Sequence, residues 1–210
     1  ISMKHVSTGL RCCGILALWL LACSTPLADE GNPTAPLERG TLLQFHWVGK
    51  GGRVVTYGQP ITRGNHTNHE GDCTIRGRLS SGGSPCDEAT NLFGKELNFQ
   101  AKGKLIRRDD GLAQFKGDIV FTGDAKVEMF RGTLVVIDRV GSHTRPHGDE
   151  HCAEPGHVEG YLYGNGVPKQ LANIRLDGLF VATGKLPEPS PKASEMELGQ
   201  IVLVGSLTAQ

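Results

Sequence analysis

Residues 97–121 read LNFQAKGKLIRRDDGLAQFKGDIVF, and this stretch decides the class of fold. Apolar or small residues occupy every second position in 97–105 and again in 113–121. A period of two residues buries one face of a β-strand and leaves the other face in water. The charged break between them, RRDDG (107–111), ends in glycine, the residue that adopts a positive φ most readily. The stretch therefore predicts a β-hairpin.

The same period recurs from Thr41 to Leu207, and no long helical pattern interrupts it. Nine strands are predicted, at about 41–48, 53–58, 73–79, 97–105, 113–121, 125–137, 158–164, 172–182 and 199–207. Within 125–137 the apolar positions change from odd to even, which predicts a β-bulge near Arg131 and Gly132. Many strands joined by short turns predict an all-β fold, a single antiparallel β-barrel, with a β-sandwich as the alternative.

Glycines in phase with the apolar faces favour the barrel. Six predicted strands carry one near the middle: Gly77, Gly103, Gly117, Gly160, Gly178 and Gly205. Glycine weakens a flat strand, so its presence there needs a local reason. Sharp coiling at the corners of a barrel is one reason, and close packing of two sheets or room for an internal ligand are the others. The last strand is expected to pair with the first and close the barrel.

The order of the strands also predicts which loops lie together. If successive strands run in opposite directions, the connections fall alternately at the two ends of the barrel. One end then receives the loops 59–72, 106–111, 138–157 and 183–198. Six of the seven histidines outside the N-terminal leader belong to two of these loops, 59–72 and 138–157. The unusual chemistry of the chain is therefore expected at one end.

Imidazole, thiolate and carboxylate are the ligands of Zn²⁺ and Cu²⁺. The candidate metal ligands are His66, His69, His143, His147, His151 and Cys152. Pro146 and Gly148 argue against a helix that would align the later histidines, and no His-Glu-x-x-His motif is present. Two other interpretations stay open. The histidines are incidental residues of a solvated loop, or they form a pH sensor, because clustered imidazoles charge together near neutrality.

Three cysteines follow the N-terminal segment: Cys73, Cys86 and Cys152. One disulfide is expected in an oxidising compartment, and an odd count leaves one thiol. Cys73–Cys86 would close a short loop, whereas Cys73–Cys152 would join the two histidine-containing loops. Both pairings stay open, because spacing alone does not determine connectivity.

The chain begins with a basic stretch that contains Lys4 and Arg11, followed by nine apolar residues at 14–22. This is the build of a secretory signal, and it is too short to span a bilayer. The sequence Leu-Leu-Ala-Cys that ends at Cys23 resembles the lipobox of bacterial lipoproteins. The resemblance implies a diacylglyceryl group on the Cys23 sulfur and attachment to a membrane of the bacterial cell envelope. Cleavage after Ala28 and simple secretion are the alternative.

Three segments follow from these observations. Residues 1–23 are predicted to be the signal peptide with its lipobox-like end, and 41–210 the antiparallel β-barrel domain. Residues 24–40 contain three prolines and no apolar period, which predicts a flexible tether.

Composition and motifs limit the function. The 22 basic residues less Lys4 and Arg11 leave 20 against 22 acidic residues, a net charge of −2 without the leader. No basic field is present to hold phosphates, so nucleic acid is not an expected partner. No Gly-x-Ser-x-Gly elbow and no phosphate-binding glycine loop occurs. Tyr161 and Tyr163 share the expected outward face and would suit contact with carbohydrate or protein.

The first prediction is therefore an exported, lipid-anchored or secreted, non-catalytic binding module whose small-molecule or protein ligand the sequence does not name. A metal-binding extracytoplasmic protein that holds Zn²⁺ or Cu²⁺ is the second. A lyase or isomerase with a pocket inside the barrel is the third, and no residue set identifies it.

Overall fold

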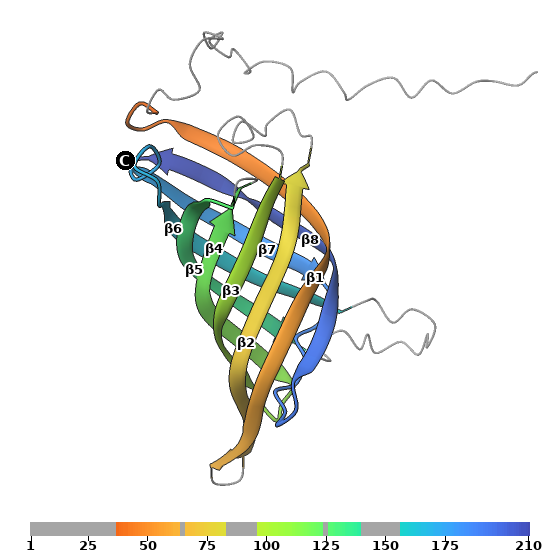
Figure 1. Cartoon of the computed structure of the whole chain (residues 1–210). Helices are drawn as coiled ribbons and strands as arrows, with labels where there is room; N and C mark the ends of the chain where they lie inside the picture. The colour runs from red at the N-terminus through yellow and green to blue at the C-terminus, as the bar shows by residue number, and fades with distance from the viewer. Residues whose placement is uncertain (1–36, 64–65, 83–95, 124–125, 140–155) are drawn as a thin grey trace, which may run out of the picture. The chain divides into compact units, whose positions relative to one another are not determined.

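The computed structural model describes residues 37–63, 66–82, 96–123, 126–139 and 156–210. They form one antiparallel β-barrel of eight strands that closes on itself (Figure 1). The strands are β1 (Leu42–Arg63), β2 (His66–Ser81), β3 (Glu96–Arg107), β4 (Leu112–Thr122), β5 (Glu128–Arg139), β6 (His157–Gly166), β7 (Ile174–Thr183) and β8 (Ser194–Ala209). The barrel belongs wholly to the unit Pro33–Gln210. The described part contains no helix long and apolar enough to cross a membrane.

Each strand pairs with the next one in sequence, and β8 pairs with β1 from Leu42↔Thr208 to Thr56↔Ser194. The predicted antiparallel barrel and the predicted pairing of the first and last strands are confirmed. Because direction alternates, the carboxyl ends of β1, β3, β5 and β7 lie at one end of the barrel, as predicted.

The number of strands is eight rather than nine, because 41–48 and 53–58 belong to the single strand β1. Residues 49–52 form no connection. They lie where the register with β2 shifts between Val48 and Arg53, and Gly51 there has a φ of 69°. Before this irregularity the buried positions of β1 are odd, and after it they are even. These glycines therefore form a bulge within a strand, where the sequence alone predicted a turn between two strands.

The predicted bulge of β5 exists, but it lies two residues earlier than expected. Facing β4, Phe130 pairs with Phe121 and Glu128 with Thr122, so Met129 is the extra residue. From Phe130 onward the inward positions are all even. Because of this bulge, the inward-facing positions of β5 are already even-numbered at Phe130, before Arg131.

Apolar side chains fill the interior. The largest fully buried ones include Trp47, Phe115, Phe121, Phe130 and Phe180. Phe99 connects opposite sides of the wall, because its ring centroid lies 6.3 Å from that of Phe121 and 6.1 Å from that of Phe180. Eight strands enclose a space just wide enough for side chains to fill. The interior is therefore a packed core.

The in-phase glycines lie where neighbouring strands approach most closely. Several face each other directly across the ladder, as Gly58↔Gly71, Gly103↔Gly117, Gly132↔Gly164 and Gly178↔Gly205. A Cβ atom on Gly103 would lie 2.1 Å from the Lys116 carbonyl oxygen and 2.3 Å from the Gly117 Cα. No Cβ atom fits at such distances, so close approach at sharply coiled corners, and not room for a ligand, explains these glycines.

Replacement of Gly103 by Ala tests this explanation. The added methyl group must push β3 and β4 apart, and we expect Gly103→Ala to lower the free energy of unfolding by about 2–3 kcal/mol. Urea denaturation of the full chain measures it. Gln100→Ala on the exposed face of the same strand is the control, with an expected change within about 0.5 kcal/mol. Equal effects of the two variants would contradict the explanation.

Candidate functional site

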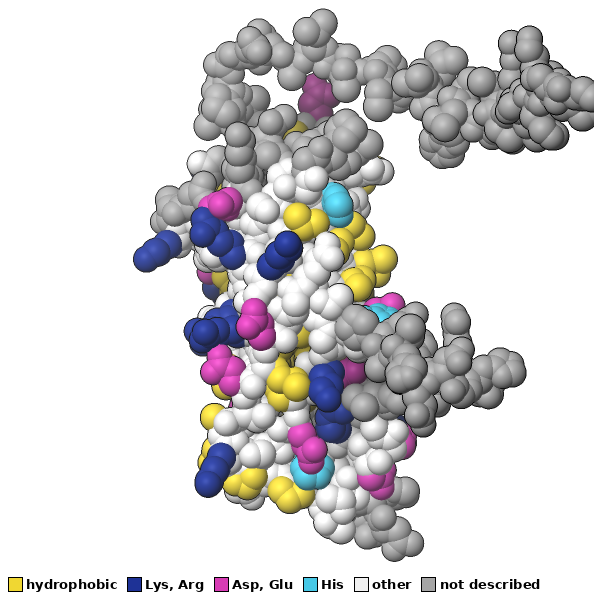
Figure 2. Space-filling view, turned by 90° about the vertical axis from the view of Figure 1, so that its right-hand side faces the viewer, with side chains coloured by type: hydrophobic (Ala, Val, Ile, Leu, Met, Phe, Trp, Pro, Cys, Tyr) yellow, Lys and Arg dark blue, Asp and Glu magenta, His cyan; other side chains and the backbone are white. Residues whose placement is uncertain are grey.

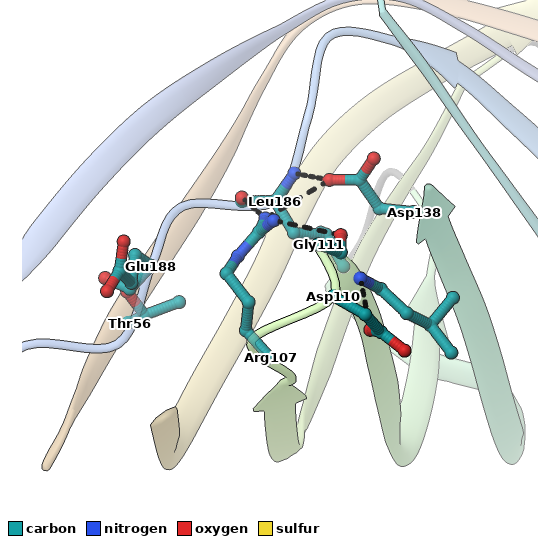
Figure 3. Close-up of polar contacts among 8 residues, drawn as sticks. Thr56, Arg107, Asp110, Gly111, Asp138, Leu186 and Glu188 are labelled. Atoms are coloured by element: carbon teal, nitrogen blue, oxygen red, sulfur yellow. Dashed lines mark hydrogen bonds and ion pairs between the residues drawn. The ribbon is translucent and has the colours of Figure 1, made fainter. Parts of the chain in front are cut away.

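The connection between β7 and β8, residues 184–193, crosses one end of the barrel and is called the strap (Figure 3). Its Leu186 is only 1% exposed, and Pro187 and Pro189 are buried as well. Three buried residues in a connection that contains three prolines indicate an ordered closure rather than a plain linker. The strap therefore completes the core at this end.

A buried ion pair holds the strap. The Arg107 Nη2 atom lies 3.2 Å from the Asp138 Oδ2 atom, and the two side chains are 12% and 3% exposed. The Leu186 N–H donates to the same Oδ2 atom at 2.8 Å, and Arg107 donates to the Leu186 carbonyl oxygen. Figure 3 shows the Leu186 backbone between the two charged groups. Both backbone groups of a buried strap residue are thus satisfied by charged partners, which form the stronger kind of hydrogen bond.

The rest of the strap is attached to β1 and β2. The Gly58 N–H donates to the Ser190 carbonyl oxygen at 3.0 Å, and the Thr56 hydroxyl donates to the Glu188 carbonyl oxygen at 3.4 Å. The His69 Nδ1 atom lies 3.0 Å from the Glu188 Oε1 atom. The strap therefore binds β1, β2, β3 and β5 together at one end of the barrel.

Beyond the strap, β1 and β2 continue as a two-stranded ribbon as far as the pair Arg63↔His66. The outer edge of β1 there is a potential template for another strand. Donors toward this edge alternate along β1, so the position after Gly58 that would donate is 60. It is occupied by Pro60, which has no N–H. Proline thus removes a hydrogen-bond donor from the outer edge of β1 beyond the strap.

The structure changes the interpretation of the first histidine group. His66 and His69 belong to strand β2, not to a loop, because residues 59–63 form the end of β1 and residues 66–72 the start of β2. The side chain of His69 contacts Glu188 in the strap. Within the described residues no three His, Cys, Asp or Glu side chains converge as a metal site. The other predicted ligands lie outside the described residues: His143, His147, His151 and Cys152.

Cys73 is a free, buried thiol on the inner face of β2, and the predicted disulfide stays a prediction. A partner sulfur would have to enter the packed core to reach it. The two predicted partners, Cys86 and Cys152, lie outside the described residues, as does Cys23. Burial raises the pKa of the Cys73 thiol to about 12. The thiol therefore stays protonated near neutral pH and is a poor nucleophile and metal ligand.

The outer wall of β6, β7 and β8 carries an apolar surface, called the wall patch. It consists of the exposed Tyr161, Tyr163, Leu179 and Val181 with the half-buried Val202 and Val204. The two tyrosine rings are nearly parallel, with centroids 6.5 Å apart. A shallow groove of about 450 Å³ opens beside them, over the backbone of Gly178 and Gly205.

Polar groups surround the wall patch. Arg175 pairs with Asp177 at 2.7 Å on one side, and His157 contacts Glu159 at 3.1 Å on the other. Figure 2 shows hydrophobic side chains gathered at the upper right of one face, whereas charged side chains are scattered over the rest. The groove over β3 and β4 is different in kind, because Lys102, Lys104 and Lys116 line it. An apolar centre with a polar rim is typical of a protein contact surface.

Sequence reasoning placed Tyr161 and Tyr163 on the outer face, and the structure confirms this. It missed Leu179 and Val181, although a signal was present. Residues 178–182 are apolar or small at both odd and even positions. Successive side chains of a strand point to opposite faces, so one of these two sets had to face outward. It also missed Arg107 and Asp138. Each lies two positions after the last apolar inward residue of its strand, so its side chain also faces inward. A charged residue at such a position indicates a charged group at the end of the core.

No family model, no curated protein and no solved structure matches this chain.

The ion pair beneath the strap makes a testable contribution to stability. Asp138→Ala leaves the Arg107 guanidinium buried without its partner, and we expect a loss of about 3–5 kcal/mol in the free energy of unfolding. Exchange of both residues, Arg107→Met with Asp138→Leu, should lose less, because no uncompensated charge remains. Urea denaturation of the full chain measures both variants.

Lys104→Ala is the matched control, since the Lys104–Asp72 pair is exposed, and it should leave the urea midpoint unchanged. A double variant as unstable as Asp138→Ala would show that the loss comes from the unsatisfied backbone groups of Leu186 and not from the uncompensated charge.

Proposed function

We propose that this protein is an exported, lipid-anchored, non-catalytic β-barrel module that binds its partners on its outer surface. One observation carries the proposal. The interior is filled by side chains such as Trp47 and Phe115, and the strap closes one end above Leu186. A ligand has no room inside a packed eight-stranded barrel, so recognition falls to the wall and the exposed segments.

The charged groups beneath the strap support a structural role for the closed end. Arg107 and Asp138 both contact the backbone of Leu186, and their side chains are almost inaccessible to solvent. A general acid or base needs access to the proton that it transfers. These two groups are engaged in holding the strap, which supports a non-catalytic module.

Attachment through Cys23 is supported by the resemblance to the lipobox and by the outer face of the barrel. Lys102, Lys104 and Lys116 lie at the middle of β3 and β4 and face outward. Each lysine at the midplane of a bilayer would cost about 2–4 kcal/mol. A lipid on the N-terminal segment is therefore the favoured form of membrane attachment.

Metabolic labelling with an alkyne fatty acid, followed by mass spectrometry of the mature N-terminus, tests the anchor. We expect a diacylglyceryl modification on Cys23 and complete loss of label in Cys23→Ala. Cys73→Ala should keep the label, because that thiol is buried in the core. An unlabelled mature chain that begins at Asp29 would overturn the anchor and support simple secretion.

A further inference from the structure

We infer that the shallow groove between the tyrosines of β6 and the Arg175–Asp177 pair of β7 is a binding site for an uncharged polysaccharide. Such a site deepens the proposed function and rests on it only in lying on the outer surface of the barrel. An aromatic face, a fixed polar pair and a net charge of zero meet in this one groove.

The wall patch is too small for a stable contact with another protein. Its exposed apolar side chains present roughly 400–500 Å². A standard protein interface buries about 800 Å² on each partner. The groove within the patch has a volume of about 450 Å³, which lies inside the range of roughly 300–1,000 Å³ for ligand sites. The dimensions therefore favour a ligand narrower than a protein surface.

The aromatic side of the groove matches the apolar face of a sugar ring. The rings of Tyr161 and Tyr163 lie 6.5 Å apart with an angle of 17° between their planes, and both side chains are about half exposed. The face of an aromatic ring is electron-rich and attracts C–H bonds. A pyranose with equatorial hydroxyls directs its axial C–H bonds to one face. Leu179 and Val204 complete the apolar lining.

The register of the strands sets polar groups beside the same rings. Asp177 pairs with Tyr163 on one side and with Ser206 on the other. The Arg175 Nε atom lies 2.7 Å from the Asp177 Oδ2 atom, and the Arg175 Nη2 atom donates to the Asp177 Oδ1 atom at 3.0 Å. Two parallel bonds fix both groups, and their other N–H groups and lone pairs can bond to hydroxyls. The hydroxyl rim of a sugar thus finds both donors and acceptors.

The charge of the groove favours an uncharged ligand. Arg175 and Asp177 cancel each other, and no other charged side chain of the described residues lines the groove. A ligand that carries phosphates or carboxylates would need an unpaired cation. The groove over β3 and β4, which three lysines line, differs in this respect.

The depth of the groove favours a polymer over a small molecule. Its floor is the backbone of Gly178 and Gly205 on the outer wall, so a ligand is covered on one side only. Small-molecule sites bury about 70–90% of the ligand surface. An extended chain compensates for shallow contact by engaging several sites at once, and many copies of this protein on one membrane would supply them.

Titration of the fluorotyrosine-labelled full chain, in detergent, with cellohexaose and with chitohexaose tests the site. The chain contains three tyrosines, so fluorine NMR gives one signal from each, and single tyrosine-to-phenylalanine variants assign them. We expect the signals of Tyr161 and Tyr163 to shift with at least one of the two sugars and to saturate. Tyr57 on β1 is 54% exposed and does not line the groove, so its signal is the internal control and should stay in place.

Variants separate the aromatic face from the polar pair. Tyr163→Ala should raise the dissociation constant at least about fivefold, because a ring face is lost, whereas Tyr163→Phe keeps the ring and should stay within about twofold. Asp177→Ala removes the fixed polar pair and should raise the constant at least about threefold. Tyr57→Ala is the matched control and should leave binding unchanged. All three side chains are exposed, so thermal unfolding should match the wild type.

Signals of Tyr161 and Tyr163 that stay in place up to about 10 mM of both sugars would overturn the inference. So would equal shifts of Tyr57, or a Tyr163→Ala variant that binds as tightly as the wild type. Shifts with the apolar probe naphthol and with neither sugar would show a groove for apolar ligands and overturn it as well. The titration does not involve the lipid, so an unlabelled Cys23 would refute the anchor alone, and a failed titration would refute the polysaccharide site alone.

Discussion

The closing of eight strands into one narrow barrel is the constraint on which the rest of the structure depends. A sheet that returns to its own first strand must coil sharply, and at its corners the backbones of neighbouring strands come too close for side chains. Facing glycines such as Gly103 and Gly117 meet this demand on the inner surface. Between the corners, large residues such as Trp47 and Phe180 fill the interior.

A filled interior has consequences for both the end and the wall of the barrel. At the end, the strap can bury Leu186 only if its backbone groups find partners, and Arg107 and Asp138 provide them. Removing two charges from water is costly unless they are paired. Arg107 and Asp138 pair with each other and bond to Leu186, whereas the buried Arg107 Nε atom has no hydrogen-bond partner among the described residues. At the wall, Leu179 lies at an outward position of β7 and is 59% exposed. The same packing thus leaves no room for a ligand inside the barrel.

Much of the fold could be predicted because a barrel wall imposes a strict period of two. The period located the strands, and the in-phase glycines favoured a barrel over a sandwich. The errors lie where the period breaks. Residues 49–52 have the composition of a turn but form a bulge, since only the pairing of β1 with both β2 and β8 distinguishes the two. The sequence did not identify Met129 as the bulge residue, because Met129 is apolar and fits the odd-numbered apolar positions that precede the change.

The site was harder to predict, because its residues are brought together only by closure of the barrel. Arg107 and Asp138 are 31 positions apart in sequence and meet beneath a strap that follows β7. His69 became a candidate because histidines are frequent in this part of the sequence. Its partner is Glu188 of the strap, a contact that the number of histidines does not predict. The wall patch spans three strands, so its extent becomes visible only once the register is known.

Native-state hydrogen exchange at the seam between β1 and β8 tests the central claim most directly. If closure is integral to the fold, the seam amides of β1 between Leu42 and Thr56 should exchange only through global unfolding. Their opening free energy should then equal that of the hydrogen-bonded amides of β3 and β4. Fast exchange along the seam, with β3 and β4 still protected, would show an open sheet and contradict the account.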